Sequence, residues 1–441
     1  MGKPTWARLQ AIKVIQQVNS RQAFVRPLID SLIRTASISS AERDFAILLA
    51  LGVTATSGEL DLIIKRSIDT KRLDTVSRSI LQLATYELVY LQKEAYVAVD
   101  QAVALAHQLK PKVAGFINWA MHRIIEQIAD FPWGDPSSEI DALVHQTAFP
   151  LWLANRLIAE LGWTAAAAFM HISNEVAPLD GADLTTGQSV SIDAEKLAKH
   201  QSGIAAGELI IADQSSQFIA HLTAQQTVLH PNCQLLEIGS GRGTKTVLIN
   251  RELQRLGVDE FVHYALEYHT FKTKVLVDRI KVYRLRNVQP ITADILLIKE
   301  LIEGGMLPPG LDVVMIDAPC SGSGTLRRNP EIRWRLSTED ITAMSAQGLS
   351  FLLAAAPYVN PGGCLVYSTC SIFTEENEKV IEAFLDDPAG TDFILTDWRH
   401  SGNLADWGCT EQIVADSYFF HSQLRSGGPD SHFAAILRRR A

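Results

Sequence analysis

The chain of 441 residues has few cysteines and lacks a long uninterrupted apolar run. Its cysteines show no C-x-x-C pair and no grouping with histidine at zinc-ligand spacing, so we expect reduced thiols, no disulfide framework and no metal site. The longest apolar runs, 45–53 and 351–359, are too short to span a bilayer, and no basic-then-apolar leader opens the sequence. These absences predict a cytoplasmic protein without a membrane partner. The five cysteines are Cys233, Cys320, Cys364, Cys370 and Cys409.

An overall excess of positive charge is also missing, because 40 Lys and Arg face 49 Asp and Glu, a net charge of −9. Residues 1–128 nevertheless carry 16 Lys and Arg against 11 Asp and Glu, a balance of +5 that leaves −14 for the remainder. A mildly basic first part suits an anionic partner, and a random distribution of surface charge explains it equally well. With 47% hydrophobic and 20% charged residues, the composition is that of an ordinary soluble protein of two or three domains.

Residues 1–128 show helical periodicity and no strand alternation. Ala7, Ala11, Val14, Ile15 and Val18 follow the spacing of one buried helical face. Ser39 with Glu42 is a capping-box pattern, and further helices are expected over 77–91 and 98–109, the latter stopped by Pro111. This part is predicted to be all-α. Residues 129–206, which begin with the Pro- and Ser-containing stretch 131–138, are predicted to be a linker and a small intermediate subdomain.

From residue 234 strands alternate with helices, which predicts a mainly parallel sheet covered by helices on both faces. A strand that passes through a turn into a helix is expected over 207–222, whereas 177–190 shows no clear periodicity. Later strands are predicted over 234–238, 261–266, 288–291, 313–316 and 364–367, with a terminal hairpin from 417–420 and 433–437. Helices are predicted over 246–256, 270–285, 344–358 and 375–385.

Polar and reactive residues follow two of these strands. Ligands bind beyond the carboxyl ends of strands in open α/β sheets, so Asp317, Cys320 and Cys370 should face one cleft. A free cysteine is more often a small buried hydrophobe than a nucleophile, but two of them after neighbouring strands, beside an acid, favour chemistry. A thiolate can add to carbon 6 of cytosine and so activate carbon 5, and an acid can stabilise the charge that develops in the ring.

A glycine-rich turn follows the first strand of this alternation and suits a nucleotide-like ligand. It runs from Glu237 through Gly239, Ser240, Gly241, Arg242, Gly243 and Thr244 to Lys245. Glu267 ends the next strand, where a carboxylate can accept both ribose hydroxyls of an adenosine ligand. Asp294 follows the third strand and could contact the adenine.

The motifs of residues 207–438 resemble those of the RNA (cytosine-C5)-methyltransferase family, whose fourth motif is D-A-P-C-S-G and whose sixth is S-T-C-S. Here they are Asp317 to Gly322 and Ser368 to Ser371. The stretch 327–334, R-R-N-P-E-I-R-W, is most similar to the bacterial Sun/RsmB branch. That branch carries a NusB-like helical RNA-binding domain, which 1–128 resembles at 41–53, 86–88, 98–103 and 116–118.

The resemblance implies an α/β Rossmann-like S-adenosylmethionine methyltransferase domain over 207–441, preceded by the all-α NusB-like domain. It also implies that Cys370 is the nucleophile, that Cys320 assists product release and that Asp317 contacts the base. The turn 237–245 with Glu267, Asp294 and Asp317 would then bind the methyl donor. Ser215 to Gln217 matches the family's short segment ahead of the first motif.

Two segments depart from the family's pattern. The usual first motif D-x-C-A-A-P-G-G-K-T is replaced by E-I-G-S-G-R-G-T-K-T, in which length and the final Lys-Thr are kept, so we expect donor binding through altered contacts. The substrate-side P-x-x-L-R-V-N segment has no good copy, and 177–184 occupies its place without the arginine. Arg327, Arg328, Arg333 and Arg335 with Trp334 are expected to form a wall that contacts phosphate and stacks a base. Six basic residues between Lys272 and Arg286 are more often a solvated helix face.

The sequence therefore predicts a monomeric enzyme that methylates carbon 5 of cytosine in RNA, expected to be small-subunit (16S) ribosomal RNA, through a covalent cysteine adduct. A flipped or unpaired cytosine is required, because stacking hides carbon 6. One alternative is a noncatalytic RNA-binding or ribosome-assembly factor that keeps the fold. Another is a nicotinamide-dependent oxidoreductase that uses 237–243 as its dinucleotide fingerprint, which would leave both thiols unexplained. An amino-group methyltransferase is disfavoured, because an Asp/Asn-Pro-Pro-aromatic motif is missing where Asp317 to Cys320 stand.

Overall fold

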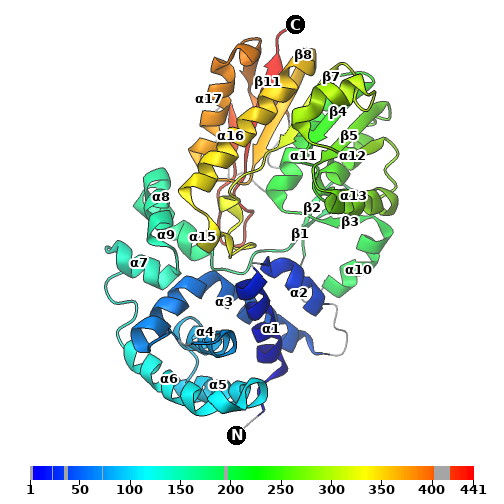
Figure 1. Ribbon diagram of the computed structural model, residues 1–441. Helices are drawn as coiled ribbons and strands as arrows, with labels where there is room; N and C mark the ends of the chain where they lie inside the picture. The colour runs from blue at the N-terminus through cyan, green and yellow to red at the C-terminus, as the bar shows by residue number, and fades with distance from the viewer. Residues whose placement is uncertain (1–2, 22, 34–37, 72, 193–196, 402–417) are drawn as a thin grey trace. The chain divides into compact units, whose positions relative to one another are not determined.

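The computed structural model describes residues 3–21, 23–33, 38–71, 73–192, 197–401 and 418–441, which fall into two units (Figure 1). The first unit comprises residues 1–177 together with 326–335, and the second comprises 178–325 together with 336–441. The predicted succession of an all-α part and an α/β part is confirmed. The finer division into three parts at 128/129 and 206/207 stays a prediction.

The first unit is helical. The five positions predicted to form one face of its first helix are all buried, since each exposes 7% of its surface or less. Ser39 caps the third helix by accepting a hydrogen bond from the Glu42 amide at 3.3 Å, whereas the Glu42 carboxylate accepts the Ala7 amide at 3.0 Å. The helices are α1 (Trp6–Arg21), α2 (Val25–Ile33), α3 (Ser40–Ser67), α4 (Thr75–Val89), α5 (Ala95–Leu109), α6 (Ala114–Gln127), α7 (Ile140–Thr147), α8 (Leu151–Leu161), α9 (Trp163–Ile172) and the short α15 (Ile332–Arg335).

Helix α3 is, among the described helices, the one long and apolar enough to cross a membrane by length and composition. Its apolar side chains are instead the centre of the helical core, where Leu49, Val53, Leu60 and Ile63 are fully buried. It packs against α1, α2, α4 and α6 of the same unit. The hydropathy of α3 is therefore that of a core helix.

The second unit is built on an eight-stranded sheet in the order β10-β11-β8-β7-β4-β5-β6, with β9 paired to β11. The neighbours from β8 to β6 are parallel, and β11 joins β8, β9 and β10 antiparallel, as the predicted terminal hairpin requires. The strands are β4 (Cys233–Ile238), β5 (Phe261–Glu267), β6 (Val288–Thr292), β7 (Leu311–Asp317), β8 (Val359–Thr369), β9 (Phe393–Thr396), β10 (Phe419–His421) and β11 (Phe433–Arg439).

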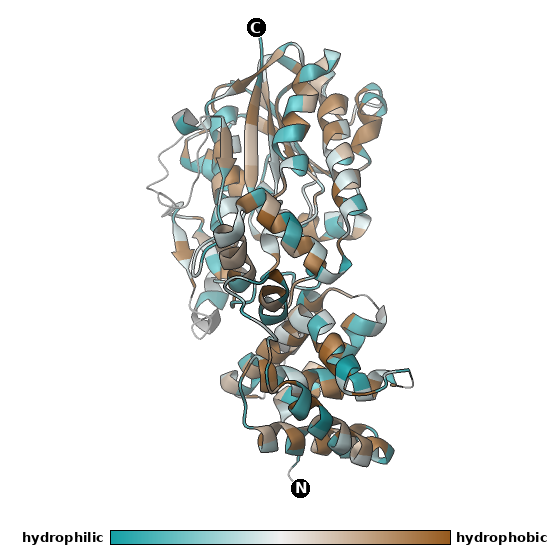
Figure 2. Ribbon diagram, turned by 90° about the vertical axis from the view of Figure 1, so that its left-hand side faces the viewer, coloured by the Kyte–Doolittle hydropathy of each residue, from teal (hydrophilic) through white to brown (hydrophobic). Residues whose placement is uncertain are grey.

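Helices cover both faces of this sheet, and the central strands alternate between the two cores. Val313 and Met315 of β7 pack with α11 and α12, whereas Val314 and Ile316 pack with α14, α16 and α17. Figure 2 shows the central strands largely in the brown of apolar residues, as expected for strands buried on both faces. The helices are α11 (Gln214–Thr227), α12 (Thr244–Arg255), α13 (Thr270–Val282), α14 (Ile298–Glu303), α16 (Thr338–Ala355) and α17 (Glu378–Asp386).

A small sheet precedes the large one. It has the order β2-β1-β3, with β1 (Asp180–Asp183), β2 (Ser189–Ser191) and β3 (Leu209–Ile211), and α10 (Leu197–Ala206) lies between β2 and β3 in the chain. Strand β3 was expected within 207–222. Strands β1 and β2 carry no apolar alternation, because β1 reads D-G-A-D, and sequence patterning therefore left them unassigned.

Candidate active site

The carboxyl end of β7 carries the acid of the predicted cleft. Asp317 is the last residue of the strand, and Ala318 continues the pairing by donating its amide to the Ser368 carbonyl at 2.9 Å. One carboxylate oxygen of Asp317 accepts a hydrogen bond from the Lys245 ammonium at 2.7 Å. The structure thus brings the end of β7 and the first turn of α12 together, as their positions in the sequence predicted.

The two thiols predicted to share a cleft lie side by side. The sulfurs of Cys320 and Cys370 are 3.4 Å apart, and the Cys370 amide lies 3.4 Å from the Cys320 sulfur. Both residues are half-buried. Cys233 and Cys364 are buried elsewhere in the sheet as small core residues, and Cys409 lies outside the described residues.

The surroundings of Cys370 favour its protonated form. The hydrogen bond with Cys320, burial and the negative charge of Asp317 together raise the pKa of the Cys370 thiol well above its usual range, and only the Lys245 ammonium opposes them. Burial alone would lower the pKa of Lys245, but the charge and hydrogen bond of Asp317 outweigh it and raise that pKa. The Lys245 ammonium, paired with Asp317, therefore lies beside a thiol whose surroundings favour the protonated form.

The glycine turn after β4 has the close backbone approach that its composition predicts. Gly239, Gly241 and Gly243 have φ values of +79°, +58° and +84°, which favour glycine. A Cβ on Gly239 would stand 2.6 Å from the Asp317 carbonyl, so only glycine lets this turn pass the end of β7. The amides of Gly239 and Ser240 both bond the Leu266 carbonyl at 3.0 Å.

The predicted donor-binding acids occupy different environments. Glu267 is 3% exposed at the end of β5, and its two oxygens accept the amides of Gly241 at 3.0 Å and His269 at 2.8 Å. Asp294 is half-buried and caps the short helical turn after β6 by accepting the Leu296 amide. Glu237 is 1% exposed, accepts the Thr246 hydroxyl at 2.6 Å and lies 3.1 Å from His263, so it joins β4, β5 and α12 from within.

The rest of the turn is solvent-facing or bound to α13. Arg242 is exposed, and Thr244 is half-buried and accepts a hydrogen bond from Arg279 at 2.6 Å. Lys272 lies 3.6 Å from Glu267. Two members of the basic stretch after residue 270 therefore support the glycine turn and its neighbouring acid, which the expectation of a solvated face did not include.

Two groups of functional interest had no signal in the sequence. Glu376, in the turn after β8, is 1% exposed and accepts hydrogen bonds from Ser321 and Ser371. His432, directly before β11, is 7% exposed, and burial lowers its pKa. Both are brought to the site by chain pairing, and neither stands in a motif whose chemistry sequence spacing could reveal.

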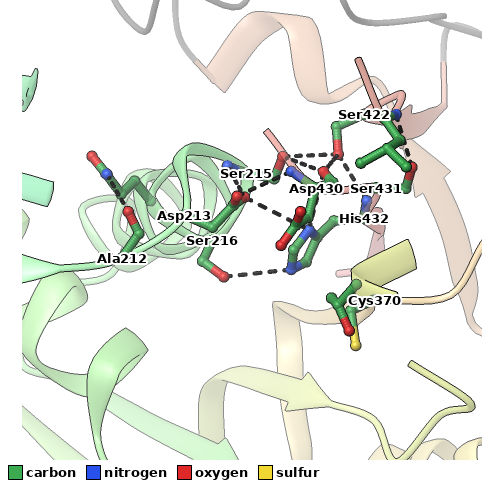
Figure 3. Close-up of polar contacts among 12 residues, drawn as sticks. Ala212, Asp213, Ser215, Ser216, Cys370, Ser422, Asp430, Ser431 and His432 are labelled. Atoms are coloured by element: carbon green, nitrogen blue, oxygen red, sulfur yellow. Dashed lines mark hydrogen bonds and ion pairs between the residues drawn. The ribbon is translucent and has the colours of Figure 1, made fainter. Parts of the chain in front are cut away.

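His432 belongs to a polar group between α11 and the β10–β11 turn (Figure 3). Its Nε2 lies 3.5 Å from the Ser216 hydroxyl and its Nδ1 lies 4.0 Å from Asp213. Asp213 caps α11 and also accepts the Asp430 amide at 3.0 Å. Ser215 donates to the Ser422 hydroxyl at 2.8 Å. The segment around 215–217 is thus held against the strand that pairs with the Cys370 strand.

The expected RNA-contacting wall is wrong for Arg333, whose side chain is fully buried in the first unit. Its guanidinium donates to the Asn174 side chain at 2.7 Å and the Ser173 carbonyl at 3.0 Å, and lies over the Phe149 ring at 4.3 Å. The Trp334 indole donates to the Ala55 carbonyl at 2.8 Å. Burial lowers the pKa of Arg333 to about 9.

Arg335 also has a partner in the first unit, and Arg327 is buried. Arg335 donates to the Ala23 carbonyl at 2.9 Å, and Arg327 is 3% exposed. The Arg328 carbonyl accepts a hydrogen bond from Arg26 at 2.9 Å. Arg333, Trp334 and Arg335 thus bond to other residues of the first unit, and Arg327 is buried, so 327–335 does not form the expected solvent-facing wall.

Two family models match the chain. Residues 226–424 match the family described as 16S rRNA methyltransferase RsmB/F, and residues 5–126 match the NusB family. The NusB match lies within the first unit, and most of the RsmB/F match lies within the second.

Curated relatives match most of the chain at low identity. A probable ribosomal RNA small subunit methyltransferase B from Synechocystis sp. is 27% identical over 89% of this chain and 90% of its own length. The ribosomal RNA small subunit methyltransferase B from Proteus mirabilis is 26% identical over 93% and 96%. Among solved structures, PH0851 matches 100% of both chains with a TM-score of 0.76 at 20% identity, a likeness of fold.

Proposed function

Because the chain joins a domain of the NusB family to a domain of the RsmB/F family of 16S rRNA methyltransferases, we propose that it methylates carbon 5 of a cytosine in small-subunit ribosomal RNA. S-adenosylmethionine is proposed as the donor, and it would supply a methyl group on an electrophilic sulfonium. The RNA cytosine would be attacked by Cys370. Curated relatives named ribosomal RNA small subunit methyltransferase B support small-subunit ribosomal RNA as the substrate.

The pair of thiols is the observation that carries this proposal. Two sulfurs 3.4 Å apart, at the ends of neighbouring strands, suit a reaction in which one thiol adds to the ring and the other assists its release. A purely RNA-binding protein needs neither thiol. A dinucleotide-dependent oxidoreductase would leave both without a role.

The residues around the glycine turn fit the donor. Each Glu267 oxygen accepts one amide and keeps a lone pair, so the carboxylate can still accept ribose hydroxyls. The Ser240 hydroxyl is buried and, among the described residues, has no hydrogen-bond partner, which leaves a polar group for a ligand at this turn. The half-buried Asp294 is proposed to contact the adenine. The buried Glu237 would support the turn indirectly, because it holds the start of α12 through the Thr246 hydroxyl.

Asp317 and Lys245 would have different roles toward the cytosine: Asp317 would contact the ring, and Lys245 would act on Asp317 and Cys370. The Asp317 oxygen that does not bond Lys245 can hydrogen-bond the cytosine ring, and it would stabilise the negative charge that develops there when it carries a proton to donate. The Lys245 ammonium holds the other Asp317 oxygen and favours the thiolate of Cys370. Because its surroundings favour the protonated thiol, Cys370 would have to lose its proton before it attacks the bound base.

Methyl transfer from labelled S-adenosylmethionine to unmodified small-subunit ribosomal RNA tests the proposal. Digestion to nucleosides should place the label in 5-methylcytidine for the wild type and leave none with Cys370→Ala. Both free RNA and assembly intermediates should be offered as substrate. Absence of label with a folded wild type and every substrate would favour the noncatalytic RNA-binding alternative, and label in another nucleoside would overturn the cytosine assignment.

A further inference from the structure

One carboxylate binds the residue that follows each of the two thiols. Glu376 Oε1 accepts the Ser321 amide at 2.6 Å, and its Oε2 accepts the hydroxyls of Ser321, at 2.6 Å, and Ser371. Ser321 follows Cys320 and Ser371 follows Cys370. Although 50 residues separate the two thiols in the chain, a single side chain thus connects their loops.

A second layer of hydrogen bonds fixes the same two loops. Ser323 lies 3.1 Å from the Ser371 hydroxyl and accepts the Ile372 amide at 3.0 Å. The Gly324 amide donates to the Cys370 carbonyl at 2.9 Å. A Cβ on Gly324 would lie 2.9 Å from that carbonyl, so glycine permits this contact. The loops are therefore joined by backbone as well as by side chains.

The turn that carries Glu376 is itself anchored to β8. The Tyr367 hydroxyl donates to the Glu376 carbonyl at 2.8 Å. Asn377 accepts the Thr369 hydroxyl at 2.6 Å and donates to the Ser371 carbonyl at 3.0 Å. The carboxylate is thus held from the strand that ends at the Cys370 loop, and it reaches across to the Cys320 loop.

The burial of this carboxylate is energetically unfavourable. Burial raises the pKa of Glu376, although the hydrogen bonds from Ser321 and Ser371 oppose the rise. A neutral side chain could fill the same space without that desolvation, but it could not accept three donors through two oxygens. The feature that the acid adds is the bridge between the loops.

We propose that Glu376 is the positioning residue that sets the separation of Cys320 and Cys370. The catalytic importance of that separation rests on the proposed methyl transfer, in which both thiols act on one cytosine. The separation itself is a property of the protein alone. The two statements can therefore be tested apart.

The test compares the full-length wild type with Glu376→Gln. The matched control is Glu375→Gln, which removes a neighbouring carboxylate that lies 3.9 Å from Lys379 and is 30% exposed. Each protein is treated with a bifunctional bimane that alkylates two adjacent thiols, and the Cys320–Cys370 cross-link is identified by peptide mapping. A monofunctional bimane measures the reactivity of each thiol separately.

The wild type and Glu375→Gln should cross-link at the same rate, and Glu376→Gln about tenfold more slowly, since a small misplacement of paired groups has effects of this size. Monofunctional alkylation should change much less. An unchanged cross-linking rate in folded Glu376→Gln would overturn the inference. So would an equal loss of monofunctional reactivity, because the effect would then be general unfolding.

Ser371→Ala provides a second variant if Glu376→Gln folds poorly. It removes the donor on the Cys370 side and keeps the Glu376 contacts to Ser321, so it should slow cross-linking less than Glu376→Gln. In the double variant Glu376→Gln/Ser371→Ala, the effect should be smaller than the sum of the single effects, because both changes remove the Glu376–Ser371 contact, although Ser371→Ala also removes the contact with Ser323. Additive effects would contradict the bridge.

Methyl transfer then links the position of the thiols to turnover. Glu376→Gln should lower kcat and leave the KM for S-adenosylmethionine unchanged, because the glycine turn is untouched. A raised donor KM with unchanged kcat would overturn the inference. Slower cross-linking together with no methyl transfer by the wild type would support Glu376 as the positioning residue and refute the proposed function.

Discussion

Replacement of Arg333 by alanine should destabilise the first unit without removing a contact to RNA. The guanidinium makes two short hydrogen bonds, to Asn174 and Ser173, from a fully buried position. Hydrogen bonds from a charged donor contribute about 1.5–3 kcal/mol each, so their loss would cost about 3–6 kcal/mol. Because the variant no longer buries a charged group, the desolvation cost of that charge is removed, and this offsets part of the lost stability. We expect a net loss of about 3 kcal/mol in the free energy of unfolding.

Denaturant unfolding of the full chain, followed by circular dichroism, measures this loss. Arg123→Ala is the matched control, because Arg123 is on the same unit and forms an exposed pair with Glu126. Its loss should change stability by less than about 1 kcal/mol. If Arg333→Ala left the unfolding curve unchanged but weakened RNA binding, Arg333 would contact RNA after all, and the buried role would be refuted.

Three further variants test the site. Cys320→Ala removes the main influence that raises the pKa of Cys370, so alkylation of Cys370 should begin at lower pH than in the wild type; an unchanged profile would contradict the coupling of the thiols. Lys245→Met removes the charge that lowers this pKa, and the same assay should show a shift to higher pH, whereas a shift to lower pH would refute the role of Lys245. Gly239→Ala places a Cβ against the Asp317 carbonyl in left-handed backbone, which should cost about 1–3 kcal/mol of stability and weaken S-adenosylmethionine binding in calorimetry; unaltered binding would argue against donor contact at this turn.

The sequence predicted those parts of the fold that depend on local pattern. The run Val313 to Ile316 was expected to be a buried strand, and it is the centre of β7. Its neighbour β8 was also expected, although it spans Val359–Thr369 rather than 364–367. The glycines of 359–369 suggested a turn, and the ladder with β7 is irregular there, because its register shifts between the Leu311–Val359 and Val313–Cys364 pairs. Pairing with β7 and β11 then continues beyond the predicted end of the strand, to Ser368 and Thr369.

The candidate site likewise has features that the sequence predicted and features that it did not. Asp317, Cys320 and Cys370 follow the ends of strands, so topology alone predicted that they lie close together. The sulfurs of Cys320 and Cys370 are 3.4 Å apart. The role of Glu376 depends on hydrogen bonds to a loop more than 50 residues away, which no local pattern encodes. The prediction that Arg333 contacts RNA was wrong because a local pattern was given too much weight. An arginine beside tryptophan resembles an RNA contact in sequence, and only its burial separates the two interpretations.

A covalent adduct between the protein and RNA would show most directly whether Cys370 adds to cytosine. Cys320→Ala is incubated with unmodified small-subunit ribosomal RNA and S-adenosylmethionine, then resolved under denaturing, reducing conditions, beside wild type and the double variant Cys320→Ala/Cys370→Ala. If Cys370 adds to cytosine and Cys320 assists release, a stable RNA-linked species should accumulate with Cys320→Ala and be absent from the double variant. An adduct that persists without Cys370, or none with Cys320→Ala while the wild type transfers methyl, would contradict the account.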